Sequence, residues 1–145
     1  MQFKVKRFVE LTTAELYEIL KSRSEIFLLE QNIVCQDMDD VDYDSLHCFL
    51  QENGRITAYL RAYYKEDDAS VIKLGRVLSL EHGVGLGTRL MQEGIDYIKI
   101  HLPCKKISIN AQCHAVGFYE RFGFRVVSDE FLEEGVPHVA MDLEI

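Results

Sequence analysis

The chain has 145 residues, 48% of them hydrophobic and 28% charged, which is the composition of an ordinary globular protein. Its length suits one domain that spans residues 1–145 and buries its own core. Asp and Glu number 24 against 16 Lys and Arg, and the net charge of −8 argues against non-specific nucleic-acid binding, which needs a basic surface. No apolar run approaches the roughly 18 residues of a membrane span, and the first residues lack the apolar block of a signal peptide. We therefore expect a cytoplasmic protein with no membrane or nucleic-acid partner.

The cysteines, histidines and acidic residues show no metal-binding pattern. The four cysteines form no C-x-x-C pair, so we interpret them as reduced thiols and not as a disulfide framework. The five histidines lack the spacing of zinc ligands. The acidic run over 37–44 fails as a calcium loop, because Ser45 stands at the required glycine and Gln51 at the required glutamate. We expect no metal, and we interpret the acidic run as a solvated loop that could attract a cationic amine.

The first predicted elements are a strand and a helix. Alternating apolar and charged residues indicate a strand over 3–9, and the capping box of Thr12 and Glu15 marks the start of a helix. The apolar stripe of this helix is expected to run through Leu16, Leu20, Arg23, Phe27 and Glu30. Two ionisable side chains, Arg23 and Glu30, would then lie on its buried face. They are candidates for binding a substrate, and the alternative is a structural ion pair between them.

A hairpin and a strand–helix alternation follow. Asn53-Gly54 predicts a tight turn between two strands. Apolar residues at helical spacing predict a long helix that Pro103 closes, and Gly123 ends a second, short helix. The expected strands cover 47–51, 55–64, 71–80, 106–111, 124–127 and 136–143, and the expected helices cover 86–102 and 114–122. This order predicts one mixed α/β domain.

Three glycines alternate in the stretch EHGVGLGTRLM, residues 81–91, which joins a strand to the long helix. Glycines before a helix N-terminus often form an anion site, because side chains there would keep the backbone away from a phosphate. A dinucleotide fingerprint fails because Thr88 replaces its third glycine, and a P-loop fails because Thr88-Arg89, and not Lys, follows Gly87. The glycines alone leave open a coenzyme phosphate site and a turn that binds nothing.

A second motif, GFYERFGF over 117–124, follows downstream. Together the two motifs resemble those of the GNAT superfamily of acyl-CoA-dependent N-acetyltransferases, and the resemblance covers nearly the whole chain. The matching positions are His82, Gly83, Gly85 and Gly87 in the loop, with His82 where Arg or Gln is usual, and Phe118, Tyr119, Gly123 and Phe124 in the second motif. The chain is most similar to the ElaA-like branch, through Arg23, Ile26, Phe27, Glu30 and Gln31, the segment 75–77, Ala111, Gln112 and His114, and the segment 135–138.

The resemblance implies an α/β (α+β) GNAT fold, in which a mixed, mostly antiparallel sheet is splayed between two central parallel strands and flanked by helices. Acyl-CoA would lie in the gap between the strands over 71–80 and 106–111. The implied cofactor-binding residues are Val77, Leu78 and Ser79 for the pantetheine arm, His82, Gly83, Val84, Gly85, Leu86, Gly87 and Thr88 for the pyrophosphate, and Gln112 and Tyr119 beside the arm.

The resemblance also implies transfer of an acetyl group from acetyl-CoA to a primary amine of a small molecule or peptide. The amine must lose a proton and the leaving thiolate must gain one. Tyr119 is the implied general acid, and the alternative is a core aromatic residue with a satisfied hydroxyl. No motif identifies the base: the candidates are Glu30, as a carboxylate on the expected apolar stripe, His138, and a water relay.

Three residues are candidates for binding the acceptor: Arg23, Glu30 and Arg76, of which Arg76 could instead pair with a carboxylate. The competing function is a noncatalytic acyl-CoA-binding module. A nucleotide-binding protein is disfavoured by the failed phosphate-loop patterns. The sequence leaves the oligomeric state open, with a homodimer among the alternatives.

Overall fold

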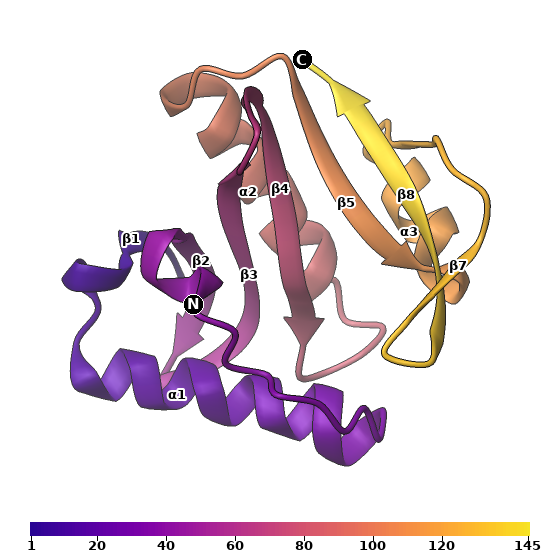
Figure 1. Cartoon of the computed structure of the whole chain (residues 1–145). Coiled ribbons are helices and arrows are strands. Elements are labelled where there is room, and N and C mark those ends of the chain that lie inside the picture. Colours follow the sequence, from indigo (N-terminus) through magenta and orange to yellow (C-terminus); the bar gives the residue numbers. More distant parts are fainter.

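An eight-stranded mixed sheet forms the centre of the computed structural model, which describes residues 1–145 (Figure 1). The strands follow the order β1-β2-β3-β4-β5-β8-β6, with β7 paired to β8. Only β4 and β5 are parallel neighbours, and this pair confirms the expected mixed sheet. The strands are β1 (Gln2–Arg7), β2 (Leu46–Glu52), β3 (Arg55–Lys65), β4 (Asp68–Ser79), β5 (Lys106–Gln112), β6 (Arg125–Val126), β7 (Phe131–Glu133) and β8 (Val136–Glu144).

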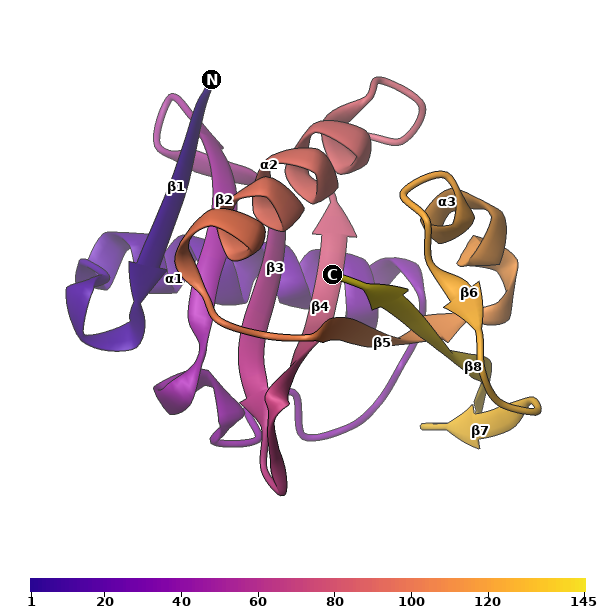
Figure 2. The same cartoon turned by 90° about the horizontal axis from the view of Figure 1, so that it is seen from above.

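Helices cover both faces of this sheet. The α-helices are α1 (Thr13–Arg23), α2 (Leu86–His101) and α3 (Val116–Glu120). The residues Ser24–Glu30 continue α1 as a π-helix, and short 3₁₀ turns lie at Phe8–Glu10, Val41–Asp44 and Cys113–Ala115. Viewed from above, the first strands separate α1 from α2, while α3 lies beside β6 and β8 (Figure 2). None of these helices combines the length and the apolar character that a membrane crossing requires.

The predicted capping box begins α1, but the predicted apolar stripe is wrong. The Glu15 N–H donates to Thr12 Oγ1 at 3.0 Å, and the Thr12 N–H donates to Glu15 Oε1 at 2.9 Å. Leu16 and Leu20 are only half-buried and Glu30 is exposed. The buried face consists of Glu15, Ile19, Ser22, Arg23 and Ile26. The face differs because Glu15 is drawn inward by two lysines of β1, and because the wider π turn rotates the residues that follow Arg23.

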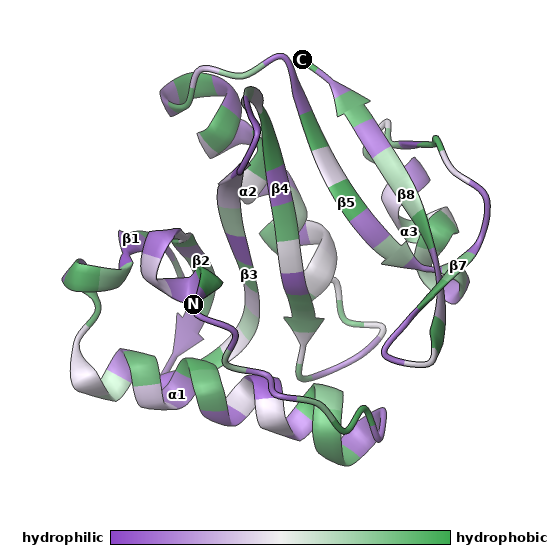
Figure 3. Ribbon diagram, in the orientation of Figure 1, coloured by the Kyte–Doolittle hydropathy of each residue, from purple (hydrophilic) through white to green (hydrophobic).

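Two apolar clusters lie on opposite faces of the sheet. The larger one joins α2 and α3 to the strands, and includes Leu90, Ile95, Ile109 and Phe124. The smaller one lies under α1 and consists of Ile19, Ile26, Phe49, Ile56, Tyr59 and Leu78. Apolar and polar residues alternate along β5, as the colouring shows (Figure 3), so Ile109 enters the larger cluster while Asn110 and Gln112 face the other side.

A β-bulge in β4 separates the two halves of the sheet. Leu78 is opposite Tyr59 of β3, but Gly75 is already opposite Arg61, so β4 carries one extra residue there. Arg76 takes up the bulge with a left-handed φ of 53°. The parallel ladder to β5 ends at Leu74, and β4 and β5 then diverge toward their carboxyl ends (Figure 1). The edge of β4 that faces β5 therefore has no strand partner beyond Leu74.

Two hairpin turns position the outer strands. Asn53-Gly54 joins β2 to β3 as predicted, with φ values of 52° and 81°. Glu134-Gly135 repeats this geometry, with φ values of 50° and 74°, and joins β7 to β8. The strand β7 has three residues, too few for an alternating pattern to reveal it. The helix expected over 114–122 is shorter than predicted, because its first turn is a 3₁₀ turn.

Candidate active site

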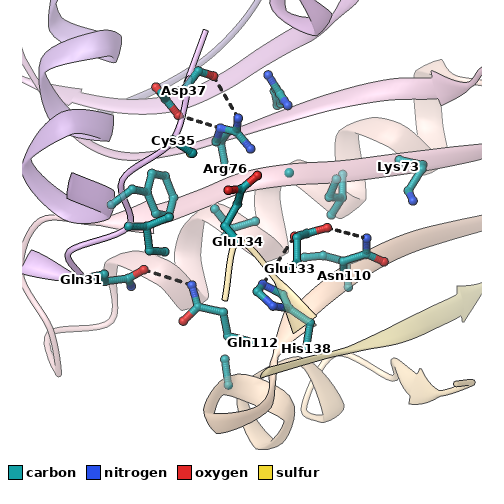
Figure 4. A pocket seen from close by; sticks show the side chains of 18 of the residues that line it. Gln31, Cys35, Asp37, Lys73, Arg76, Asn110, Gln112, Glu133, Glu134 and His138 are labelled. Atoms are coloured by element: carbon teal, nitrogen blue, oxygen red, sulfur yellow. Dashed lines mark hydrogen bonds and ion pairs between the residues drawn. The ribbon is translucent and has the colours of Figure 1, made fainter. Parts of the chain in front are cut away.

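A cavity of about 450 Å³ opens where β4 and β5 diverge. Its floor is formed by residues of β3, β4 and β5, and its walls by the β7–β8 hairpin and the segment that follows the π-helix (Figure 4). The labelled side chains are mostly polar, and they converge on this space from segments far apart in the sequence. This volume is in the range of small-molecule sites.

Tyr119 lines the cavity from α3 and is 7% exposed. Its ring makes edge contacts with Phe118 and Phe124. Burial raises the pKa of Tyr119 above its usual range, and no hydrogen bond within the protein opposes this effect. Tyr119 is thus a buried member of the larger apolar cluster, as the alternative interpretation holds, but its hydroxyl has no hydrogen-bond partner within the protein.

His138 of β8 lines the same cavity and is 6% exposed. Its Nδ1 lies 2.7 Å from the carbonyl oxygen of Val136, which can only accept, so Nδ1 carries a proton. Nε2, which is the acceptor nitrogen when the ring is neutral, lies 3.5 Å from Glu133 Oε2. Glu133 in turn accepts from Asn110 Nδ2 at 3.1 Å (Figure 4). A carboxylate so held can stabilise the imidazolium that forms when Nε2 takes a proton.

Three arginines and three aspartates form an ion-pair network beneath one wall of the cavity. Arg23, only 1% exposed, donates to Asp37 at 3.0 Å and to Asp42 at 2.7 Å. Arg61 donates to Asp39 at 2.7 Å and to Asp42 at 3.1 Å. The expectation of a solvated acidic loop is thus only partly right: Asp40 and Asp44 are exposed, but Asp37, Asp39 and Asp42 neutralise buried arginines. The alternative pairing of Arg23 with Glu30 is also absent, and Arg23 is not among the cavity-lining residues.

The network fixes the charge of its carboxylates. The hydrogen bond from Arg61 lowers the pKa of Asp39 to about 2. Burial alone would raise the pKa of Asp42, but the hydrogen bond from Arg23 and the charges of both arginines lower it. Arg76, the third arginine, donates to Asp37 from Nε at 2.8 Å and also lines the cavity. Arg76 thus pairs with a carboxylate, as one interpretation holds, and it also lines the cavity, as binding of an acceptor there would require.

The glycine loop presents a free helix N-terminus at the open end of the gap. Gly83 and Gly85 have left-handed φ values of 78° and 83°, which favour glycine, and α2 begins at the next residue, Leu86. The first helical bond runs from the Arg89 N–H to the Gly85 carbonyl at 3.0 Å, so the preceding amides have no intrahelical partner. Unpaired amides at the positive end of a helix dipole fit a pyrophosphate.

Glycine is required at position 87 for packing, and not for a left-handed backbone as at Gly83 and Gly85. A Cβ atom at Gly87 would lie 3.3 Å from the ring of Phe118. The absence of a side chain therefore lets α2 pack against α3, and couples the loop to the motif that carries Tyr119. Of the strand residues expected to contact pantetheine, Val77 lines the cavity, whereas the Leu78 side chain enters the core under α1. Leu78 could therefore contact the arm through its backbone alone.

Two polar contacts connect the end of the π-helix to both sides of the open gap. His82 Nε2 lies 2.9 Å from Glu30 Oε1, and Gln112 Nε2 donates to Gln31 Oε1 at 3.0 Å. His82 thus contacts a carboxylate on the loop side, and Gln112 contacts an amide on the β5 side. Glu30 does not line the cavity. The placement of Glu30 on a buried face was wrong, because its side chain is exposed, although the adjacent Gln31 lines the cavity.

Several cavity residues escaped the sequence analysis. Lys73, Glu133 and Glu134 belong to no motif, and nothing in the local pattern distinguishes them from surface charges. The acidic run could have been recognised as a partner of arginines only through the pairing of β3 with β4, which brings Arg61 and Arg76 to one face. That juxtaposition depends on long-range strand register.

Comparison with known proteins agrees with this geometry. The sequence profile of the acetyltransferase (GNAT) domain matches residues 15–145. Protein ElaA of Escherichia coli (strain K12) is 34% identical over 140 residues, which cover 94% of this chain and 92% of ElaA. The crystal structure of Escherichia coli ElaA matches with a TM-score of 0.91 at 33% identity, over 99% of both chains. An acyl-CoA N-acyltransferase from Pseudomonas aeruginosa matches with a TM-score of 0.88 at 31% identity, over 98% of this chain and 99% of that one.

A sheet that opens between two parallel strands, with a glycine loop and a helix N-terminus at the opening, defines an acyl-CoA N-acyltransferase fold. The chain belongs to the GNAT acetyltransferase family, and its resemblance to the ElaA-like branch is confirmed. It is accordingly an acyl-CoA-dependent acyltransferase with acetyl-CoA as its co-substrate.

Proposed function

We propose that the protein transfers the acetyl group of acetyl-CoA directly to a primary amine of a small molecule or peptide, with Tyr119 as general acid and His138 as general base. One observation carries the proposal: an unpaired tyrosine hydroxyl and an acceptor imidazole nitrogen line a single cavity at the opening between β4 and β5. A cytoplasmic reaction is part of this proposal, supported by four cysteines that form no disulfide.

The proposed binding mode uses groups that the fold leaves unpaired. The amides before Arg89 suit the pyrophosphate, and the edge of β4 beyond Leu74 can pair with the amides of the pantetheine arm as another strand would. Backbone N–H groups on this edge are also suited to stabilise the thioester oxygen as it gains charge. Gln112, which lines the cavity at the end of β5, can contact the same arm.

In the proposed step, His138 Nε2 takes a proton from the ammonium of the acceptor. The free amine nitrogen then bonds to the thioester carbon, and the carbon–sulfur bond breaks. The thiolate leaves with the bonding electrons and takes the hydroxyl proton of Tyr119, while the amide nitrogen gives up its second proton to solvent. The Tyr119 phenolate then regains a proton, through solvent, from the imidazolium of His138, which restores both groups. A tyrosine with its ordinary pKa of about 10 is already protonated at neutral pH; burial raises the pKa of Tyr119 further, so the hydroxyl keeps its proton until the thiolate forms beside it.

The test is amine-dependent release of free thiol from acetyl-CoA. We expect turnover with the wild type, a loss on the order of 100-fold in kcat for Tyr119→Phe, and wild-type rates for Tyr17→Phe, whose side chain is 69% exposed on α1. Binding of acetyl-CoA with no turnover on any amine would instead make the protein an acyl-CoA-binding module.

A second pair of variants tests which residue is the general base. His138→Gln removes the proton acceptor from the cavity, and we expect a fall in kcat on the order of 100-fold with the affinity for acetyl-CoA retained. Glu30→Gln changes a side chain outside the cavity, and we expect kcat to stay near the wild-type value. The opposite pattern would assign the base to Glu30 and reject His138.

A further inference from the structure

We propose that the acceptor is a small amino carboxylate, in which the reacting amine is separated by several atoms from a carboxylate that binds Lys73. This proposal rests on the proposed acetyl transfer and names the class of its acceptor. The relevant charges are those of the cavity-lining side chains that form no ion pair within the protein.

Almost every charged side chain around the cavity has a partner. Arg61 and Arg76 are neutralised by the aspartates of the network. His138 faces Glu133. Lys73 also lines the cavity, yet it forms no ion pair or hydrogen bond, and it is the one lysine there. The cavity therefore presents a single uncompensated cation to whatever enters it.

The strand register shows why no protein carboxylate neutralises Lys73. Lys73 is opposite Tyr63 of β3 on one side and Ser108 of β5 on the other. The next residue in this row is Asp142 of β8, but its carboxylate accepts from Ser108 and pairs with Lys106 at 3.1 Å. Asp142, the only residue of opposite charge in this row across the strands, is thus already bound to Ser108 and Lys106.

The pyrophosphate of acetyl-CoA is no partner for Lys73 either. Lys73 lies six residues before the end of β4 at Ser79, which corresponds to roughly 20 Å of extended strand. The glycine loop begins beyond that end. Lys73 lies toward the closed end of the gap, where the parallel ladder to β5 is still intact.

Two carboxylates of the β7–β8 hairpin line another wall of the cavity and can bind a cation. Glu133 lies beside His138, and Glu134, in the turn between β7 and β8, lines the cavity without forming any ion pair or hydrogen bond (Figure 4). An acceptor arrives as an ammonium ion, which this pair attracts to the proposed base. The cavity thus offers a cation and carboxylates on different walls, which is the complement of a molecule that carries both charges.

The strands also give the approximate separation of these two charges. His138 is opposite Gln112 of β5, and Lys73 is opposite Ser108, four positions earlier. Four residues correspond to roughly 13 Å along the strand. Because strand side chains stand roughly perpendicular to the sheet, much of this separation remains between the two charged groups, and it exceeds the distance between the amine and the carboxylate of glycine. A chain of several atoms, as in an ω-amino acid or in a dipeptide that reacts at its N-terminus, fills it.

The test compares three matched acceptors: γ-aminobutyrate, its carboxamide and butylamine, with glycine as the short-chain comparison. For the wild type we expect kcat/KM to be highest for γ-aminobutyrate. Lys73→Gln should raise the KM for γ-aminobutyrate about 10- to 100-fold, as loss of a charge-assisted contact predicts, and leave the KM for butylamine unchanged. Lys73→Glu should shift the preference to a diamine. The control is Lys99→Gln, on the exposed face of α2.

Two results would overturn the proposal: equal kcat/KM for γ-aminobutyrate and butylamine in the wild type, or equal loss of both in Lys73→Gln. Binding of γ-aminobutyrate to the CoA-loaded protein, measured by calorimetry, separates this proposal from acetyl transfer itself. Absence of turnover with Lys73-dependent binding of γ-aminobutyrate would reject the enzyme and retain the site. Turnover on amines without Lys73-dependent binding would retain the enzyme and reject the site.

Discussion

Replacement of Asp42 by Asn tests whether the arginine–aspartate network supports the fold. Asp42 Oδ1 accepts from Arg23 at 2.7 Å and from Arg61 at 3.1 Å, and these arginines are 1% and 3% exposed. Loss of one member of a buried ion pair costs about 3–5 kcal/mol. Because each arginine keeps a second aspartate, Asp37 or Asp39, we expect a loss near the lower limit, about 3 kcal/mol of unfolding free energy.

The assay is urea denaturation followed by circular dichroism. The m-value should stay constant while the midpoint falls, because the variant changes stability and not the surface exposed on unfolding. Asp44→Asn is the matched control, since this neighbouring aspartate is exposed and forms no ion pair, and its effect should stay within about 0.5 kcal/mol. A loss below about 1 kcal/mol for Asp42→Asn would refute the structural role of the network.

Two further predictions concern pH and the glycine loop. The folded protein holds the pKa of Asp39 near 2 and also lowers that of Asp42. Their stabilisation is therefore complete above about pH 5, where unfolded aspartates are ionised, and is lost as the pH falls toward 2. An unchanged urea midpoint between about pH 5 and about pH 2.5 would contradict this. Gly83→Ala places a side chain at φ 78° with no steric clash. The free loop of the variant should leave this conformation, and restoring it on binding, at a cost of about 1 kcal/mol, should weaken acetyl-CoA binding several-fold. Gly117→Ala, also without a clash, should leave the dissociation constant unchanged, and equal values for both variants would reject the loop's role.

Local signals in the sequence were sufficient for most of the fold. The capping box at Thr12, the turn at Asn53-Gly54 and the spacing of α2 each depend on residues close together in the chain, and each is present in the structure. The errors occur where tertiary contacts override local pattern. The prediction of the apolar stripe on α1 was wrong because the lysines of β1 bind Glu15 on the buried face and because a π turn follows Arg23.

The candidate site was only partly predictable for the same reason. The loop glycines and Tyr119 belong to motifs whose spacing is visible in the sequence. Lys73 and Glu133 can be recognised as site residues only when the strand order is known, because it brings β4, β5 and the β7–β8 hairpin around one cavity. Glu30 illustrates the converse, since a residue that looked buried in a helical pattern contacts His82 outside the cavity.

The most direct test of the central claim follows the acetyl group itself. Protein, acetyl-CoA labelled with carbon-13 in the acetyl group, and γ-aminobutyrate with butylamine are incubated together, and the products are identified by mass spectrometry and NMR. The account predicts that the label appears in an amide of the acceptor, with one free thiol released per amide, and that the amide forms on the order of 100-fold more slowly when Tyr119 is replaced by Phe. Failure of the protein to bind acetyl-CoA, or label that reaches only acetate at a rate independent of the amine, would contradict it.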